Sequence, residues 1–212
     1  MKLYKTGCYL FGLLIFLGIG SCKQRNELPI YNPSDFNPQL VDASLQGVEE
    51  HTVAAFKLIN QNGITITQEN YRNKIYVTDF FFTRCLTFCP IMSNNMEKLQ
   101  EKFLEDDNVM FLSLSVTPEL DSVPILKEYA KKHGVIDGKW NITTGDKKHI
   151  YNLARKSYFA VVDQGDGGLQ DFIHTPNFIL IDKDKRIRGV YDGLKEAEVE
   201  RIIEDIRLLQ NE

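Results

Sequence analysis

The sequence predicts an α/β domain in which helices flank a central mixed sheet, with an added hairpin at its N-terminal side. Three observations support this fold class. Residues 74–82 form a nearly continuous apolar run, strand-like and helix-like segments alternate after them, and a short polar turn separates two late strand-like segments. The chain has 212 residues, 43% of them hydrophobic, so it can bury a core of this size.

The first elements follow from local patterns. Residues 53–60 are rich in apolar side chains, and the turn-forming residues 61–63 separate them from a β-branched stretch at 64–67, which predicts a hairpin. Residues 74–82 are β-branched and aromatic without clear alternation, as is typical of a strand covered on both faces. Apolar residues then recur at helical spacing over 90–103.

The remaining elements continue this alternation. Asp121 or Ser122 suits the N-cap of the next helix, and the polar residues 183–185 suit a tight turn between two antiparallel strands. We expect strands at 108–116, 140–142, 175–182 and 186–191, and helices at 121–132, 146–156 and 196–209. Alternating strands and helices imply right-handed crossovers and a parallel core. This order of strands and helices is that of a thioredoxin-like fold.

The charge balance argues against a nucleic-acid partner. Lys and Arg number 25 against 29 Asp and Glu, giving a net charge of −4, and no basic stripe runs along the chain.

The N-terminal residues predict the location of the protein rather than a part of its fold. Residues 1–21 have a positive start and an apolar run too short to span a bilayer, as in a signal peptide. Ile19, Gly20 and Ser21 ahead of Cys22 match a bacterial lipobox, in which the cysteine is acylated and becomes the first residue; the alternative is an ordinary signal peptide in which Cys22 is incidental.

These segments divide the chain into three parts. We expect a signal peptide at 1–21, a lipid-anchored tether at 22–50, which is polar and carries three prolines, and a domain at 51–212. The protein is then expected on the periplasmic side of the cell envelope, held to a membrane through lipid on Cys22.

Two cysteines remain for chemistry after this processing, because Cys8 leaves with the signal peptide and Cys22 carries lipid. Cys85 and Cys89 are four residues apart, so a disulfide between them closes too short a loop to stabilise the fold much. They lie where a core strand meets its helix, and the helix N-terminus favours thiolates there. Thiolates are both nucleophiles of disulfide exchange and soft metal ligands, and the spacing alone does not choose between these chemistries.

A third candidate residue is His174, which precedes the last pair of strands. In a thioredoxin-like fold this entry faces the cysteine loop, so we expect His174 near Cys85 and Cys89. Two thiolates and an imidazole suit Cu(I), and also Cu(II) when a further group completes the shell. Structural zinc usually takes four protein ligands, which disfavours it here. The alternative is that His174 is a polar loop residue.

The chain resembles the Sco/SenC family of copper-binding proteins over roughly residues 50–210. The residues that carry the resemblance are 82–85, 89–90, 115–119, 126–130, Trp140, 144–146 and 171–174. The resemblance implies copper ligands at Cys85, Cys89 and His174. It also implies delivery of copper to, or reduction of the thiols of, the binuclear copper centre in cytochrome c oxidase subunit II or another copper or thiol client.

Two departures from the family pattern bear on the chemistry. Residues 117–121 are Thr-Pro-Glu-Leu-Asp where the family often has Asp-Pro-Glu-Arg-Asp, so one charge pair near the surface of the fold is lost. In addition, Pro176 follows Thr175 where family members often lack proline. Thioredoxin-like reductases carry a cis-proline at this place. A cis Pro176 would therefore favour disulfide exchange.

The alternative function is a thiol–disulfide oxidoreductase of the cell envelope that needs no metal, with Cys85 and Cys89 as its catalytic pair. A peroxiredoxin-like peroxidase fits less well, since it would use a lone reactive cysteine. Asp79 is unusual because it interrupts the apolar run ahead of the cysteines. A buried carboxylate needs a partner, and in a thiol enzyme it can accept a proton.

Overall fold

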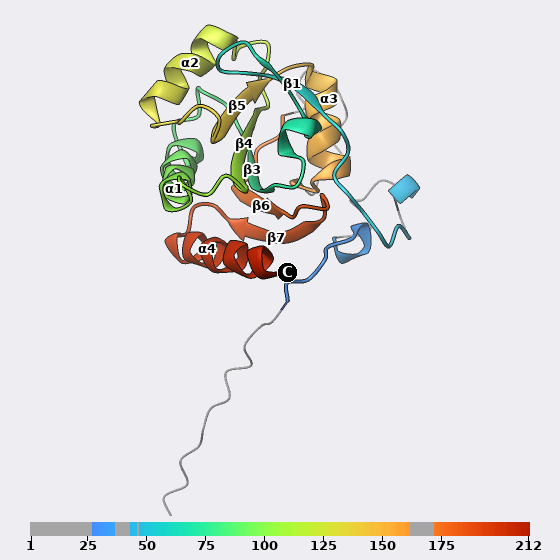
Figure 1. Ribbon diagram of the computed structural model, residues 1–212. Coiled ribbons are helices and arrows are strands. Elements are labelled where there is room, and N and C mark those ends of the chain that lie inside the picture. The colour runs from blue at the N-terminus through green and yellow to red at the C-terminus, as the bar shows by residue number, and fades with distance from the viewer. Residues whose placement is uncertain (1–26, 37–42, 46, 162–171) are drawn as a thin grey trace, which may run out of the picture.

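The structure is a computed structural model that describes residues 27–36, 43–45, 47–161 and 172–212 (Figure 1). The predicted signal peptide and Cys22 lie outside these residues. The strands are β1 (Lys57–Asn60), β2 (Thr65–Thr67), β3 (Ile75–Phe81), β4 (Val109–Ser115), β5 (Trp140–Thr144), β6 (Asn177–Ile181) and β7 (Ile187–Asp192). The helices are α1 (Phe88–Lys102), α2 (Val123–Lys132), α3 (Lys147–Asn152) and α4 (Glu196–Asn211), with short turns η1 (Pro33–Asp35), η2 (Ala43–Leu45), η3 (Gln68–Tyr71) and η4 (Leu153–Ser157).

One seven-stranded mixed sheet organises the domain, in the order β2-β1-β5-β4-β3-β6-β7. Strands β3, β4 and β5 are parallel, as the alternating pattern predicts, whereas β6 and β7 form the expected antiparallel pair. The N-terminal hairpin of β1 and β2 joins the sheet through β5. The predicted fold class is therefore confirmed.

Strand β3 lies between β4 and β6, and all seven of its residues are buried. Its nearly continuous apolar pattern, interrupted by Thr78 and Asp79, arises because each face of the sheet carries a hydrophobic core. Helices α1, α2 and α4 contribute to one core, which includes Val77, Phe81 and Trp140. The other core lies on the opposite face under α3 and η4, and includes Tyr76 and Phe80 (Figure 1).

Two helices differ from the expected ones. The segment expected as a single helix over 146–156 is the short helix α3 followed by a π-helical turn, in which the Tyr158 N–H donates to the Leu153 carbonyl at 2.8 Å. Helix α1 begins at Phe88 rather than at Pro90, so Cys89 lies in its first turn.

Part of the segment expected as a tether packs against the domain. Leu28 and Pro33 are buried, and Tyr31 forms a β-bridge with Ile187 at the edge of the sheet. Among the described residues, no helix combines the length and the apolar character that a membrane crossing requires.

Candidate thiol and metal site

The two cysteines lie together in the loop that joins β3 to α1. Both are free thiols with little exposed surface, Cys85 in the loop and Cys89 in the first helical turn. The Cys85 N–H donates to the Phe82 carbonyl at 3.2 Å, which turns the chain back as it leaves the strand. The junction therefore brings the two sulfurs to the N-terminal end of α1, as the sequence predicts.

Hydrogen bonds to sulfur make the two thiols unequal. The backbone N–H of Cys89 donates to the Cys85 Sγ at 3.4 Å, and the Thr87 hydroxyl lies 3.6 Å from the same sulfur. Burial alone would raise the pKa of Cys85, but these groups outweigh it because they stabilise the thiolate, and the pKa falls to about 7. A large fraction of Cys85 is therefore ionised at neutral pH.

Cys89 has the opposite character. Burial raises its pKa to about 12, and the neighbouring Cys85 adds to the shift. We expected the helix N-terminus to favour the thiolate form of both cysteines. It does so only for Cys85, because at Cys89 the cost of burying a charge outweighs every favourable contact. Cys85 therefore has the character of a nucleophile, and Cys89 that of its buried, protonated partner.

Asp121 holds the loop that carries these thiols, a role that sequence reasoning missed. Its carboxylate accepts from the Thr83 hydroxyl at 2.6 Å, from Ser115 at 2.5 Å and from Thr117 at 2.9 Å, and also from the Thr83 N–H at 3.3 Å. Ser122, not Asp121, is the N-cap of α2. The available signal was the cluster of Ser, Thr and Asp where β4 ends.

Asp79 occupies the face of β3 that looks toward the cysteine side of the core. It is 3% exposed and alternates with Val77 and Phe81, which pack in the same cluster as Cys89. The Ser113 hydroxyl donates to its carboxylate at 2.5 Å. Burial raises the pKa of Asp79 to about 7, although this hydrogen bond opposes the shift.

Ser113 links Asp79 to the one tryptophan of the chain. The Trp140 indole N–H donates to the Ser113 hydroxyl at 2.9 Å, which orients that hydroxyl toward the carboxylate. The partner that a buried Asp79 requires is therefore a hydroxyl from the next strand rather than a cation.

His174 lies at the entry to β6 and is exposed. Its ring stacks on Phe172 with centroids 5.9 Å apart, and Phe172 packs edge-on against Phe82 at 5.0 Å. Because Phe82 is just ahead of Cys85, the His174 segment contacts the base of the cysteine loop. No group of three or more His, Cys, Asp or Glu in the described part of the chain is arranged to hold a metal ion.

The structure thus brings Cys85 and Cys89 together, whereas it does not place His174 in a ligand cluster with them. The assignment of these three residues as copper ligands stays a prediction. The peptide bond before Pro176 is trans, since the described residues contain no cis peptide bond, so the cis-proline argument for disulfide exchange does not apply.

Comparison with known proteins identifies the family. A sequence model of SCO1/SenC matches residues 45–210. The chain belongs to the SCO1/SenC family. A SCO1/SenC family lipoprotein from Bacillus anthracis is 32% identical, with a TM-score of 0.67 over 78% of this chain and 98% of that one.

Two further structures place the chain within the family. BsSco, a member of the Sco family of cytochrome c oxidase assembly proteins in which a disulfide switch was identified, is 30% identical, with a TM-score of 0.64 over 77% of this chain and 96% of its own. The copper-bound ScoI of Bradyrhizobium japonicum is 24% identical, with a TM-score of 0.60 over 74% and 99%, and shows the shared fold.

Proposed function

We propose that this Sco-family protein is a copper-binding assembly factor. It delivers copper to, or reduces the thiols of, the binuclear copper centre of cytochrome c oxidase subunit II or a related client. The observation that carries the proposal is the pair of buried, free thiols at the start of α1, of which Cys85 has a pKa lowered to about 7. Family membership supports the same function.

The donor set suits copper as cargo. Cys85 and Cys89 supply two soft sulfur ligands, which favour Cu(I), and His174 is the candidate third ligand. When copper is bound, both thiols act as thiolates, and the protons they lose pass to solvent or to nearby bases. In the structure the His174 ring stacks on Phe172 and forms no ligand cluster with the thiols among the described residues.

The same pair supports reduction of a client disulfide. The Cys85 thiolate attacks one client sulfur, which breaks the client disulfide and forms a mixed disulfide while the other client sulfur leaves as a thiolate. Cys89 then loses its proton and attacks the Cys85 sulfur. This releases the second client thiolate, so the client gains two electrons and the Cys85–Cys89 disulfide forms. An external dithiol reductant is needed to restore the pair.

Exposed apolar side chains around the thiols support a protein client. Leu86, between the cysteines, is 91% exposed, and Phe88 and Ile91 on the first turns of α1 are 42% and 47% exposed. A protein surface that docks over the thiols would bury these side chains.

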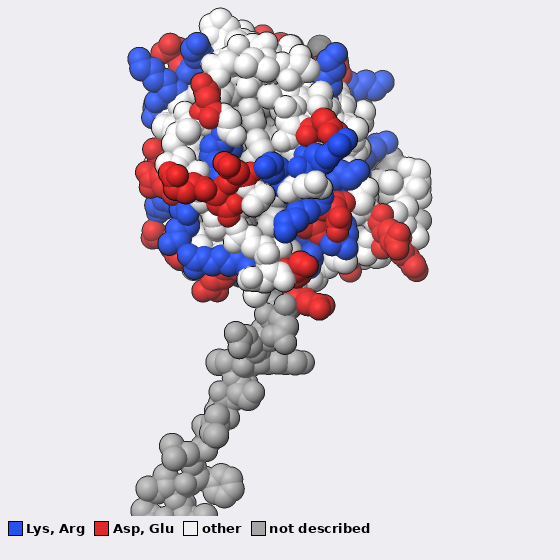
Figure 2. Space-filling model, viewed as in Figure 1, with Lys and Arg blue, Asp and Glu red and all other residues white. Residues whose placement is uncertain are grey.

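The charged side chains do not suggest a nucleic-acid partner on the face shown in Figure 2. Lys, Arg, Asp and Glu are interspersed there, whereas a nucleic-acid-binding surface carries clustered Lys and Arg.

Copper titration of the full chain, reduced and in detergent, tests the proposal. We expect one copper per chain and a thiolate-to-Cu(II) charge-transfer band that is lost in Cys85→Ser and in Cys89→Ser. His174→Ala should lose the band or bind copper at least tenfold more weakly. His149→Ala, which changes a histidine on α3, is the matched control. Stoichiometric, tight copper in His174→Ala would remove that residue from the site.

The second candidate function is a thiol–disulfide oxidoreductase without an obligate metal. The low pKa of Cys85 beside a protonated Cys89 favours it. Under this alternative, turnover on a mixed-disulfide substrate survives His174→Ala unchanged. Loss of turnover in that variant would tie His174 to the reaction and count against the metal-free alternative.

Localisation is part of the proposal. Acylation of Cys22 would hold the protein to a membrane on the periplasmic side, as the lipobox pattern of residues 19–22 predicts. Mass spectrometry of the mature N-terminus tests this. Cys22→Ser should release the chain into the soluble fraction, and recovery of the variant in membranes would argue against a lipid anchor.

A further inference from the structure

Arg188 on β7 joins the start of the described chain to its end. The side chain is 4% exposed, and its Nη1 donates to the Asp182 carboxylate at 3.0 Å. Its Nε and Nη2 donate to the backbone carbonyls of Pro29 and Leu28 at 3.1 and 2.8 Å. Nη2 also pairs with the Glu212 carboxylate at 2.6 Å. A buried guanidinium needs such acceptors, so residues 28–29 are part of its environment rather than a loose extension.

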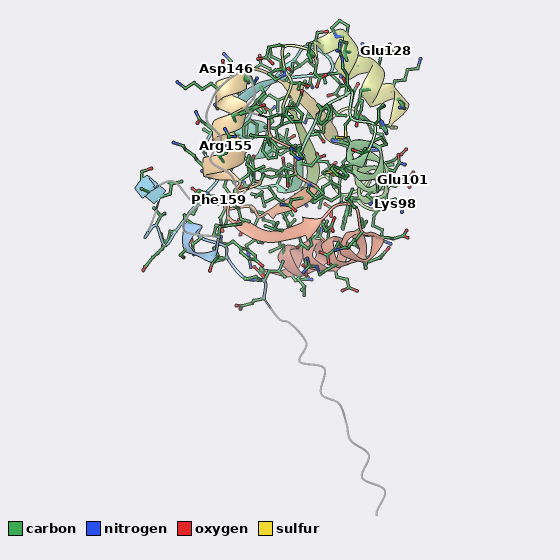
Figure 3. All side chains as sticks on the ribbon, turned by 180° about the vertical axis from the view of Figure 1, so that it is seen from behind. Lys98, Glu101, Glu128, Asp146, Arg155 and Phe159 are labelled. Carbon is green, nitrogen blue, oxygen red and sulfur yellow. The ribbon has the colours of Figure 1, made fainter. Side chains whose placement is uncertain are left out.

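The chain remains attached to the domain after these residues. The Tyr31 N–H donates to the Ile187 carbonyl at 2.9 Å, which covers the open edge of β7 at its first residue. Asn32 accepts from the His51 N–H at 3.1 Å. The Phe36 ring then packs on Phe159, which is labelled in Figure 3, with centroids 4.8 Å apart. We call residues 28–36 together with Arg188 the N-terminal clamp.

The clamp holds the chain at the end of the sheet opposite the cysteines. Strand β3 runs toward Cys85, and β7 runs parallel to it, since each is antiparallel to β6. Ile187, where β7 begins, therefore lies at the end where β3 begins. Helix α4 also ends there, because Gln210 donates to Asp106, just ahead of β4. The described N-terminal segment starts beside this end of α4 (Figure 1).

We propose that the end of the sheet that carries the clamp faces the lipid bilayer and that Cys85 and Cys89 are held facing away from it. The inference rests on the proposed acylation of Cys22. It goes beyond that proposal because it assigns an orientation and a maximum reach to the copper site. The surface that faces the lipid contains the C-terminal end of α4 and the β6–β7 turn.

Chain length makes the orientation restrictive. Six peptide links (28 − 22) separate Cys22 from Leu28, and they extend at most about 20 Å. The length of β3 adds roughly 20 Å between the clamp end and the cysteine loop. Together these lengths place the thiols at most about 40 Å from the bilayer surface, at the end of the sheet away from the attached segment. A free tether from Cys22 to residue 53 could extend to about 100 Å and would allow any orientation.

Energy transfer in lipid nanodiscs tests the orientation. The full acylated chain, carrying Cys85→Ser and Cys89→Ser, receives a donor dye either at Leu86→Cys beside the thiol loop or at Lys183→Cys in the β6–β7 turn. Both positions are exposed. With an acceptor on the lipid headgroups, we expect stronger transfer from position 183 than from position 86. Equal transfer, or stronger transfer from position 86, overturns the orientation.

Matched insertions test the clamp itself without touching its contacts. A ten-residue Gly/Ser insertion between Glu27 and Leu28 lies ahead of the clamp, so it should lower and broaden the transfer from both dyes. The same insertion between Glu49 and Glu50, which are exposed and follow the clamp, should leave the transfer as in the parent chain. Equal responses to the two insertions overturn the clamp.

Copper binding separates this inference from the proposed function. Both insertions leave the thiols untouched, so in a background that retains Cys85 and Cys89 they should bind copper like the parent. If the parent chain failed to bind copper while the energy transfer followed the expected pattern, only the copper function would be overturned. A chain that does not associate with nanodiscs overturns the anchor and this inference together.

Discussion

At the residue scale, the two cysteines are distinguished by their surroundings rather than by their spacing. The Cys89 N–H and Thr87 stabilise the Cys85 thiolate, whereas burial keeps Cys89 protonated. The sequence indicated that a helix N-terminus would favour thiolates. It could not indicate which sulfur would be desolvated, because that depends on how the helix packs on the sheet.

Alkylation should reveal this difference. In the mature Cys89→Ser chain, the rate of Cys85 alkylation by iodoacetamide should rise with pH around a midpoint near 7, because only the thiolate reacts. In Cys85→Ser, Cys89 should react at least tenfold more slowly at pH 7.5. Midpoints near 8.5 in both variants, the value of a free thiol, would contradict the assignment.

Asp79 should make stability depend on pH. Its pKa is raised from an ordinary value near 4 to about 7, so the folded state binds the proton more tightly than the unfolded state. The free energy of unfolding therefore falls as pH rises from about 4 to 7 and levels off above that range. Asp79→Asn removes this loss of stability. The free energy of unfolding of the variant minus that of the parent should therefore rise by roughly 2–4 kcal/mol between pH 5 and pH 8.

Urea unfolding at the two pH values measures this effect. Asp184→Asn, which removes an exposed carboxylate on the β6–β7 turn, is the control and should follow the parent. Because Cys85 also titrates near neutral pH, the informative quantity is the difference between variant and parent, in which its contribution cancels. A constant difference across the pH range would show that Asp79 is ionised throughout.

At the element scale, hydrophobic patterns predicted most of the sheet because they respond directly to burial. The nearly continuous apolar run of β3 indicated a strand with a core on each face, and the polar turn at 183–185 indicated the antiparallel pair of β6 and β7. The division of the expected helix over 146–156 into α3 and a π-helical turn had no such signal, because the pattern of apolar residues gives only the average helical spacing.

Polar networks between elements were not predictable in the same way. Asp121 and Thr83 are 38 residues apart, and each alone looked like an ordinary cap or loop residue. Likewise, the position of His174 depends on aromatic contacts of Phe172 with Phe82, which no periodicity encodes. The candidate site was therefore predicted as a set of residues, whereas its geometry was not.

Loss of the Asp121 network should loosen the cysteine loop. Asp121→Ala leaves four donors without their acceptor, so we expect it to lower the free energy of unfolding by about 2–4 kcal/mol. Faster amide exchange at Thr83 should accompany this loss. Ser122→Ala, which removes a neighbouring side chain that makes no capping hydrogen bond, should cost less than about 0.5 kcal/mol. Equal losses in the two variants would contradict a specific role for Asp121.

At the scale of the whole molecule, the two ends of the described chain stabilise each other. Leu28 packs in the same core as Leu209 and Ile206 of α4, and its N–H donates to the Glu212 side chain at 3.1 Å. Polarity and three prolines in residues 22–50 gave no indication of this packing, because a tether and a docked segment can share the same composition.

Leu28→Ala should therefore destabilise the domain although it lies outside the span of the family match. Leu28 is 4% exposed, so truncation leaves a cavity between the segment and α4, and we expect a loss of about 2–3 kcal/mol in urea unfolding. Ile30→Ala, two residues on and 42% exposed, is the matched control and should cost less than about 1 kcal/mol. If Leu28→Ala unfolded with the parent's midpoint, residues 28–36 would not be held in solution, and the short limit on the distance from the membrane to the thiols would be lost with them.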